Sequence, residues 1–515
     1  MNVTRLPLRL TADHHRVIAR SFLPGEPSRI HAIIERVCSL PGAEVSSMVA
    51  TLVTDYRKRH KDIREIFQQN YAAAIALVAE HPDASEERRL LLGAYFTSEY
   101  SFESVALFNP SMVLHPEQDG VPFGSARFIM SLRACGEGHI SSIEFRTGVV
   151  DAEQRITVNP PTRFALTARP VADALYDKQS YIQKLVEMKA HSPLAEPFLA
   201  LLDDQFTMNS LKYAVEKCNT QGGVTQLKEL ANNMLWLARS NYELKFSPDT
   251  AISERVIFPV SDNESRGIED ARFVRFIFPD GRVAYYATYT AYNGFRVLPQ
   301  FIETSDFIHF KINTLNGACV QNKGMALFPR KVANKFMMAS RLDGENNYLL
   351  QSDNIRFWNE SKLVRGPKYP WEFVQVGNCG SPIETENGWI LLTHGVGPMR
   401  QYWIGALLLD LDDPSHVIGE MTEPLLVPNA DERDGHVPNV VYSCGAMRHR
   451  DHLIIPYAVS DSYTSIATVA ISELLAAMCP SRKPLRGRSA TDAQSVAPAR
   501  TGESKLPSIG NDLIE

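Results

Sequence analysis

Residues 265–294 read SRGIEDARFVRFIFPDGRVAYYATYTAYNG. Apolar and polar residues alternate on both sides of the PDG turn, a pattern that predicts a β-hairpin. Two carboxylates and an arginine, Glu269, Asp270 and Arg272, stand at the start of its first strand. A solvated salt-bridge cluster is the ordinary explanation for such a group, so the rest of the chain must decide whether it is a site.

Strand-rich text of the same kind continues from Phe246 to about Ala470, with turns such as LDGENN, ENGW and DLDDP. Together with an earlier strand-rich run, it forms a loose repeat whose units begin near Phe128, Phe273, Lys335, Trp389 and Leu453. The spacing in the second half, roughly 50 to 65 residues, is typical of propeller blades. We therefore predict a mainly β fold, a five-bladed β-propeller. A β-sandwich with helical additions is the alternative, although its strands would recur at closer intervals.

Helical patterns lie on both sides of the first repeat unit. The stretch PSRIHAIIERVCSL, for example, has isoleucines at helical spacing behind a proline suited to a helix start. The predicted organisation is a helical N-terminal region (1–105), a first propeller blade (106–171), a helical insertion between the first two blades (172–245), the remaining blades (246–479) and a disordered tail (480–515).

The composition of the 515 residues, 44% hydrophobic and 22% charged, is that of an ordinary globular protein. A net charge of −6 gives no sign of a nucleic-acid partner, and no apolar stretch approaches the ~20 residues of a membrane span. The seven cysteines stand singly, without CxxC spacing, which argues against a disulfide framework or a zinc site. We expect a cytoplasmic protein that uses no metal or other cofactor and has no nucleic-acid or membrane partner.

Polar residues recur about once per repeat unit within the apolar text. Because the innermost strand of each propeller blade faces the axis, such recurrence favours a shared site over separate structural roles. The residues are Asn109, Arg133, Glu269, Asp270, Arg272, Lys323, Arg341, His394 and Asp461.

Ten sequence blocks in a fixed order strengthen this interpretation. They are FNPS, GIEDAR, YTAYNG, TSDF, NKGMALFP, ASRLDG, THGV, YWIGALLLDLDDP, HVPNVVYSCG and YAVSD. With them, residues 107–170 and 250–475 resemble glycoside hydrolase family 130, the inverting β-mannoside phosphorylases and β-mannosidases. The helical segments look like those of a longer branch of that family. The family usually has proline where this chain has Ala271, a change that keeps every charged group.

The resemblance implies a role for most of the recurring residues. Asp270 matches the general acid, which in the phosphorylases protonates the glycosidic oxygen through a sugar hydroxyl. A general acid must be protonated near neutral pH, so we expect its pKa to be raised. Asn109, Arg133 and Asp461 match positions that hold the mannosyl unit. We group Glu269 and Arg272 with these substrate-binding residues, although the sequence assigns Glu269 no particular role.

The nucleophile decides between two reactions. Lys323, Arg341 and His394 match the phosphate pocket of the family's phosphorylases, and inorganic phosphate would then be the co-substrate. A hydrolase needs a carboxylate base instead, for which Glu137, Glu144 and Asp306 are candidates.

The retained basic trio favours phosphorolysis of a β-mannoside to mannose 1-phosphate, with a small oligosaccharide as the substrate. The alternatives are an inverting β-mannosidase such as a β-1,2-mannosidase, a non-catalytic sugar-binding propeller and a protein-interaction propeller. The sequence leaves open the linkage and whether the helical segments form a homo-oligomer interface.

Overall fold

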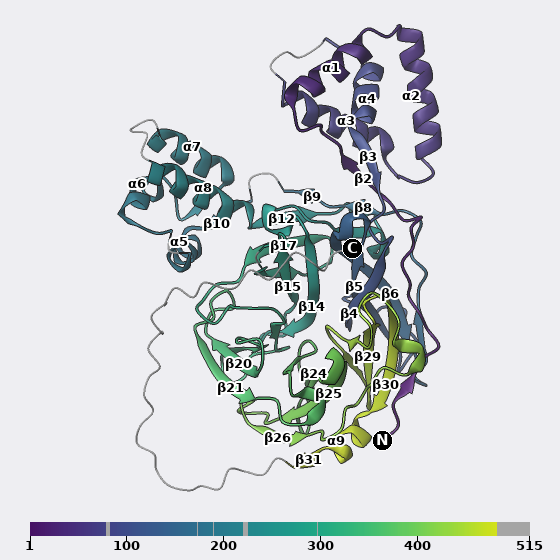
Figure 1. Cartoon of the computed structure of the whole chain (residues 1–515), viewed down its shortest axis with the longest axis vertical. Helices are drawn as coiled ribbons and strands as arrows, with labels where there is room; N and C mark the ends of the chain where they lie inside the picture. Colours follow the sequence, from purple (N-terminus) through teal and green to yellow (C-terminus); the bar gives the residue numbers. More distant parts are fainter. Residues whose placement is uncertain (79–82, 172–173, 189, 220–224, 296, 481–515) are drawn as a thin grey trace. The chain divides into compact units, whose positions relative to one another are not determined.

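The computed structural model describes residues 1–78, 83–171, 174–188, 190–219, 225–295 and 297–480 (Figure 1). The fold is mainly β, with helices in two stretches of the chain. The predicted disordered tail, 480–515, lies outside the described residues except for Pro480.

The largest sheet has twelve strands and contains the first two predicted repeat units. Its main path runs β4-β5-β6-β14-β15-β16-β17-β12-β9, and a parallel pairing of Gly267 with Ser141 joins β14 to β6. The strands are β4 (Ala106–Leu114), β5 (Ala126–Cys135), β6 (Ser141–Val150), β7 (Ile156–Val158), β8 (Leu166–Thr167), β9 (Arg169–Pro170), β12 (Tyr242–Lys245), β13 (Arg255–Ile257), β14 (Gly267–Ile277), β15 (Val283–Tyr292), β16 (Val297–Thr304) and β17 (His309–Thr314).

Three further sheets contain the rest of the strand-rich text. The four-stranded sheet consists of β18 (Ala326–Leu327), β19 (Phe336–Ser340), β20 (Asn347–Ser352) and β21 (Glu360–Arg365). The six-stranded sheet consists of β22 (Gln375–Asn378), β23 (Ile383–Thr385), β24 (Gly388–Val396), β25 (Tyr402–Leu409), β26 (Val417–Glu420) and β31 (Cys479–Pro480). The five-stranded sheet consists of β1 (Thr4–Arg5), β27 (Val441–Tyr442), β28 (Met447–His449), β29 (His452–Val459) and β30 (Tyr463–Ala470).

The two helical regions have separate hydrophobic cores. The first contains α1 (Pro27–Cys38), α2 (Gly42–Tyr56), α3 (Ile63–Ile75) and α4 (Glu86–Tyr95), beside the two-stranded sheet β2 (Ile18–Ser21) and β3 (Thr97–Tyr100). The second contains α5 (Lys178–Glu187), α6 (Glu196–Leu199), α7 (Met208–Asn219) and α8 (Thr225–Arg239), with β10 (Tyr176–Asp177) and β11 (Gln205–Phe206). A last helix, α9 (Ile471–Ala477), follows β30.

The N-terminal segment contains strand as well as helix, which the sequence analysis does not predict. Strand β1 pairs antiparallel with β30 at the other end of the described chain, with Thr4 opposite Thr468. The first residues therefore complete the five-stranded sheet.

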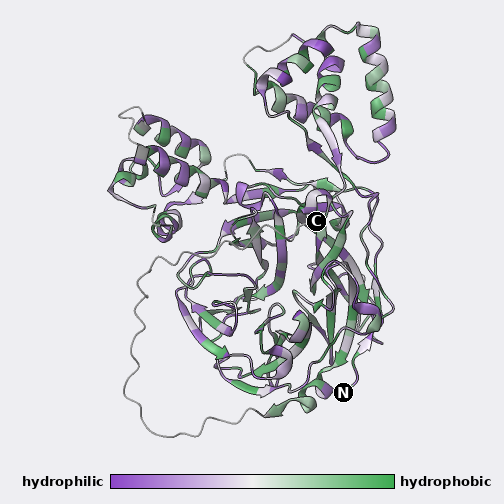
Figure 2. Cartoon of the chain, in the orientation of Figure 1, coloured by the Kyte–Doolittle hydropathy of each residue, from purple (hydrophilic) through white to green (hydrophobic). Residues whose placement is uncertain are grey.

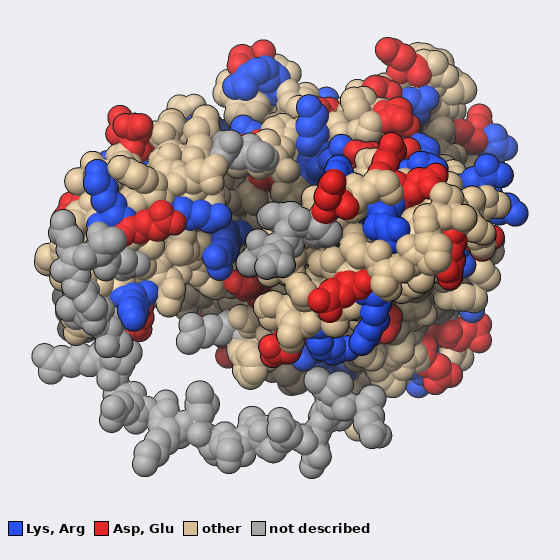
Figure 3. All heavy atoms as spheres, turned by 90° about the horizontal axis from the view of Figure 1, so that it is seen from above, with Lys and Arg blue, Asp and Glu red and all other residues tan. Residues whose placement is uncertain are grey.

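Hydrophobic residues (green) are frequent along the strands of the larger sheets, where hydrophilic residues (purple) are interspersed (Figure 2). The face drawn in Figure 3 has Lys, Arg, Asp and Glu interspersed. Among the described residues, a single helix of the length and apolarity needed to cross a membrane is not found; only the pair α1 and α2, bent by 110°, meets that test together.

Candidate active site

Two β-bulges turn polar side chains out of the ordinary alternation of their strands. The bulge in β14 lies between Glu269 and Arg272, and Asp270 within it has φ = 57°. The bulge in β4 lies between Phe108 and Ser111, and Asn109 within it has φ = 49°. Bulges of this kind re-aim side chains, often next to active sites. Here they direct Asn109 and Asp270 toward each other, and the Asn109 Nδ2 donates to Asp270 Oδ1 at 2.6 Å.

Ala271 occupies the bulge position that is proline, Pro110, in β4. Because both positions follow a residue with positive φ, we predict that Ala271→Pro is tolerated and stabilises the fold by about 0.4–1 kcal/mol, through lower entropy of the unfolded chain. Thermal unfolding monitored by circular dichroism measures this. Ala271→Gly is the matched control and should lower the melting temperature. A lower melting temperature for the proline variant would contradict the equivalence of the two bulges.

Strands from distant parts of the chain, some of them from different sheets, meet at these bulges. Phe273 N donates to Ser111 Oγ at 3.0 Å, and Cys444 N donates to the Pro110 carbonyl at 2.9 Å. The Arg272 guanidinium, 2% exposed, reaches the Asn378 carbonyl at 2.7 Å and the Tyr442 hydroxyl at 2.5 Å. Arg272, predicted to bind substrate, therefore links three sheets.

The predicted acid Asp270 lies in a cluster of opposite charges. Arg133 on β5 contacts Asp270 Oδ1 through Nη1 at 3.3 Å and Glu269 Oε1 through Nη2 at 2.9 Å. The other Glu269 oxygen accepts from Lys323 Nζ at 2.6 Å. The fold thus brings together five residues that are predicted separately along the chain: Asn109, Arg133, Glu269, Asp270 and Lys323.

The charge state of Asp270 differs from the prediction of a raised pKa. Burial alone would raise its pKa, but Arg133, the Asn109 hydrogen bond, Arg272 and Lys323 together hold the pKa below its ordinary value. The cause is that cations outweigh desolvation here. In the free site Asp270 is therefore a carboxylate near neutral pH.

Asp461 shows the opposite behaviour. It lies in the turn between β29 and β30 with φ = 51°. Burial and the negative charge of Asp270 raise its pKa to about 6, against the attraction of Arg133. The structure thus places Asp461 within electrostatic reach of Arg133 and Asp270.

Arg341 and His394 form the second part of the predicted phosphate pocket. Arg341 Nη1 lies 3.2 Å from His394 Nε2. Because a guanidinium only donates, that nitrogen must accept, which leaves the imidazole proton on Nδ1, 3.9 Å from Cys379 Sγ. Burial and the nearby Arg341 and Arg272 hold the His394 pKa well below its usual value. His394 is therefore neutral, and the trio contributes two cations rather than three.

Two of the three candidate bases have other roles. Glu144 is completely buried and forms ion pairs with Arg16 and Arg146. Asp306 accepts from the backbone N–H groups of Ile308 and His309 at 2.9 Å, so it stabilises a turn. Glu137 is exposed in the 3₁₀ turn Glu137–His139.

Two further residues belong to the site. Tyr442 packs against the His394 ring with centroids 5.0 Å apart and contacts Arg272, while Asn378 has a buried Oδ1 without a hydrogen-bond partner among the described residues. Asn109 Oδ1 and Arg341 Nε are likewise buried and have no hydrogen-bond partner among the described residues. Unpartnered buried polar atoms are rare and suit ligand binding. Tyr442 lies within the block HVPNVVYSCG, which was the available sequence signal.

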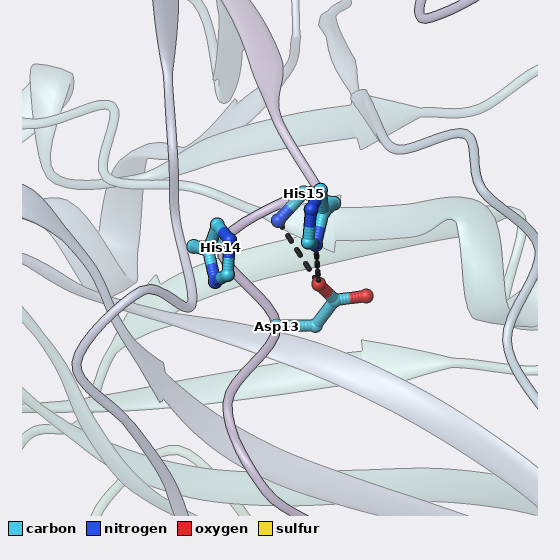
Figure 4. A group of neighbouring side chains, drawn as sticks. All are labelled: Asp13, His14 and His15. Atoms are coloured by element: carbon cyan, nitrogen blue, oxygen red, sulfur yellow. Dashed lines mark hydrogen bonds and ion pairs between the residues drawn. The ribbon is translucent and has the colours of Figure 1, made fainter.

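Within the part of the chain that the structure describes, one group of side chains elsewhere has donor atoms close enough to suggest a metal. Asp13, His14 and His15 have one donor each within 4.8 Å of one another (Figure 4). Asp13 Oδ1 accepts from the His15 backbone N–H at 2.9 Å and lies 3.0 Å from His15 Nδ1. The group is a sequence-local turn with both histidines exposed, and this bonding accounts for it.

Several sheets thus meet at a partly buried carboxylate, hydrogen-bonding amides and cationic side chains. A family model described as β-1,4-mannooligosaccharide phosphorylase, that of glycoside hydrolase family 130, matches residues 227–479.

Among curated proteins, the chain is 31% identical over 252 residues to a 1,2-β-oligomannan phosphorylase of a Thermoanaerobacter species, covering 46% of this chain and 81% of that protein. It is 30% identical over 227 residues to a β-1,2-mannobiose phosphorylase of Listeria innocua, covering 42% of this chain and 62% of that protein. A solved structure of a Listeria innocua β-1,2-mannobiose phosphorylase with β-1,2-mannobiose aligns with a TM-score of 0.44 at 21% identity, over 72% of this chain and 92% of that one.

The chain therefore belongs to glycoside hydrolase family 130. It is an enzyme of the glycoside phosphorylase or glycosidase type, as the resemblance implies.

Proposed function

We propose that the protein catalyses inverting phosphorolysis of β-mannosides, releasing α-mannose 1-phosphate. The observation that carries this is the set of cations near Asp270. Lys323 contacts the neighbouring Glu269, and Arg272 is in electrostatic reach of both Asp270 and His394, which lies beside Arg341. Cationic hydrogen-bond donors suit a phosphate dianion and its transition state. The curated relatives that match are also named as phosphorylases.

The reaction balances with these groups alone. Phosphate forms a bond to the anomeric carbon from the face opposite the leaving oxygen, and the carbon–oxygen bond of the glycoside breaks. Asp270 must first take up a proton, because it is ionised in the free site. It passes that proton, through a sugar hydroxyl, to the leaving oxygen, and the proton of the attacking hydrogen phosphate then replaces it on Asp270. Asn109, Arg133 and Asp461 would hold the mannosyl unit, as in the sequence-based prediction.

We also propose a five-bladed propeller as the finer architecture. The twelve-stranded sheet would supply two blades, β4–β6 and β14–β17, because a single parallel pairing joins those halves along its main path. The three smaller sheets would supply one blade each. A site at the meeting of inner strands is what that architecture produces.

The direct test is incubation of the full chain with β-1,2-mannobiose and with β-1,4-mannobiose, with and without inorganic phosphate, while mannose 1-phosphate and free mannose are quantified. The β-1,2 isomer comes first because two relatives, matched over 252 and 227 residues, are named for β-1,2-linked substrates. We expect mannose 1-phosphate only when phosphate is present. Free mannose at a rate indifferent to phosphate would replace this proposal with hydrolysis, and binding without turnover would identify a sugar-binding protein.

A further inference from the structure

Four charged side chains of alternating sign connect the cationic pocket to the acid. Lys323 Nζ contacts Glu269 Oε2 at 2.6 Å, Glu269 Oε1 contacts Arg133 Nη2 at 2.9 Å, and Arg133 Nη1 contacts Asp270 Oδ1 at 3.3 Å. Each oxygen of the single Glu269 carboxylate thus holds a different cation. One of those cations belongs to the predicted phosphate pocket, and the other holds the acid.

The bulge makes this connection. Successive residues of a regular strand point to opposite faces, yet the adjacent Glu269 and Asp270 both contact Arg133. The Glu269 residue is 9% exposed. Charges that are shielded from water interact more strongly than the same pairs at the surface, so a change at one end is felt at the other.

We propose that Glu269 is a positioning residue that couples anion binding at Lys323 to protonation of Asp270. This rests on the proposed function, because phosphate is the anion concerned. A dianion bound at Lys323 neutralises part of the positive charge that Lys323 otherwise presents to Glu269. Glu269 then neutralises more of the Arg133 charge, and Arg133 stabilises the Asp270 carboxylate less. The negative charge of the anion acts in the same direction.

The electrostatics of the free site fit this coupling. Arg133 and Lys323 are two of the groups that hold the Asp270 pKa below its ordinary value, so weakening their influence must raise it. The other charged or titratable groups in electrostatic reach of Asp270 are Arg272, Asp461, Tyr442 and Cys444, besides the neighbouring Glu269. Asp270 would thus be ionised in the free enzyme and become an acid when the nucleophile is in place.

Proton uptake on anion binding tests the proposal directly. Sulfate is the probe, because it is a dianion of phosphate shape that does not titrate near neutral pH. Calorimetric titration of the full chain in two buffers of different ionisation enthalpy gives the protons taken up per sulfate bound. We expect uptake by the wild type and no uptake by Asp270→Asn. In Glu269→Gln we expect uptake to fall by about half or more, because the linkage is reciprocal.

Further variants keep the result interpretable. Lys323→Gln should bind sulfate more weakly, through Arg341, and take up fewer protons, so the coupling is tested even where Glu269→Gln does not fold. Lys335→Gln, on the surface near Glu360, should behave as wild type. Uptake that is unchanged in Glu269→Gln would overturn the proposal. So would uptake that persists in Asp270→Asn and disappears in Asp461→Asn.

The coupling and the proposed function fail in different ways. Phosphate-dependent release of mannose 1-phosphate without proton uptake leaves the function standing and overturns the coupling. A wild type that binds no sulfate and makes no mannose 1-phosphate overturns both.

Discussion

Replacing Asp270 by asparagine is expected to lower kcat for phosphorolysis by about 10²–10⁴-fold, the usual contribution of a general acid. Asparagine keeps the shape of the side chain and its contact with Asn109 but has no proton to give to the leaving oxygen. Initial rates of mannose 1-phosphate release at saturating phosphate measure the effect. The Kd for the mannoside, measured by calorimetry, should change much less than kcat.

The matched control is Asp280→Asn, on the exposed turn of the same hairpin, where Asp280 pairs with Arg282 at 2.9 Å. Exposed pairs of this kind contribute little, so this variant should retain wild-type rates. An Asp270→Asn enzyme with near-normal kcat would place the acid elsewhere, and Asp461, with its pKa of about 6, would be the next residue to test.

The second large effect is expected at Arg341. Replacement by glutamine should raise the phosphate concentration needed for half-maximal rate by about 10²–10³-fold, because a charge-assisted contact to a dianion is lost from a partly buried pocket. The KM for the mannoside should stay within a few-fold of wild type. Steady-state kinetics with each substrate varied in turn separates the two constants.

Arg330→Gln provides the comparison for Arg341→Gln. Arg330 pairs with Glu384 at 2.5 Å on the surface, so its loss should leave both KM values unchanged. An Arg341→Gln enzyme with an unaltered phosphate KM would remove Arg341 from the proposed pocket. The remaining candidates would be Lys323 and the buried Arg272.

The hairpin formed by β14 and β15 was predictable because its alternation is local. Its strands are observed as Gly267–Ile277 and Val283–Tyr292, on either side of the PDG turn. The bulge at Asp270 was not predictable, since it exists only relative to the partner strand. The same holds for the sharing of one sheet by the first two repeat units, which depends on a pairing between distant strands.

The clustering of Asn109, Arg133, Glu269, Asp270 and Lys323 was predictable from repeated polar residues, but the charge states were not. The pKa of Asp270 is lowered by Arg133 and Asn109, which are far away in the sequence. His394 is neutral because burial and the positive charges of two nearby arginines lower its pKa. Glu144 is a possible base by sequence, but in the structure it forms an ion pair with Arg16 from the N-terminal segment. Each of these properties belongs to tertiary contacts.

The pairing of β1 with β30 has a consequence for how the protein is made. During synthesis β1 leaves the ribosome long before the strand beside which it lies, because Thr4 pairs with Thr468. Contacts between such distant segments are slow to form, and an unpaired strand is prone to stick to other chains meanwhile. Two residues, Thr4 and Arg5, make a short strand that offers few groups for a wrong partner. The five-stranded sheet can therefore remain incomplete at little risk until β30 has been synthesised and β1 can pair with it.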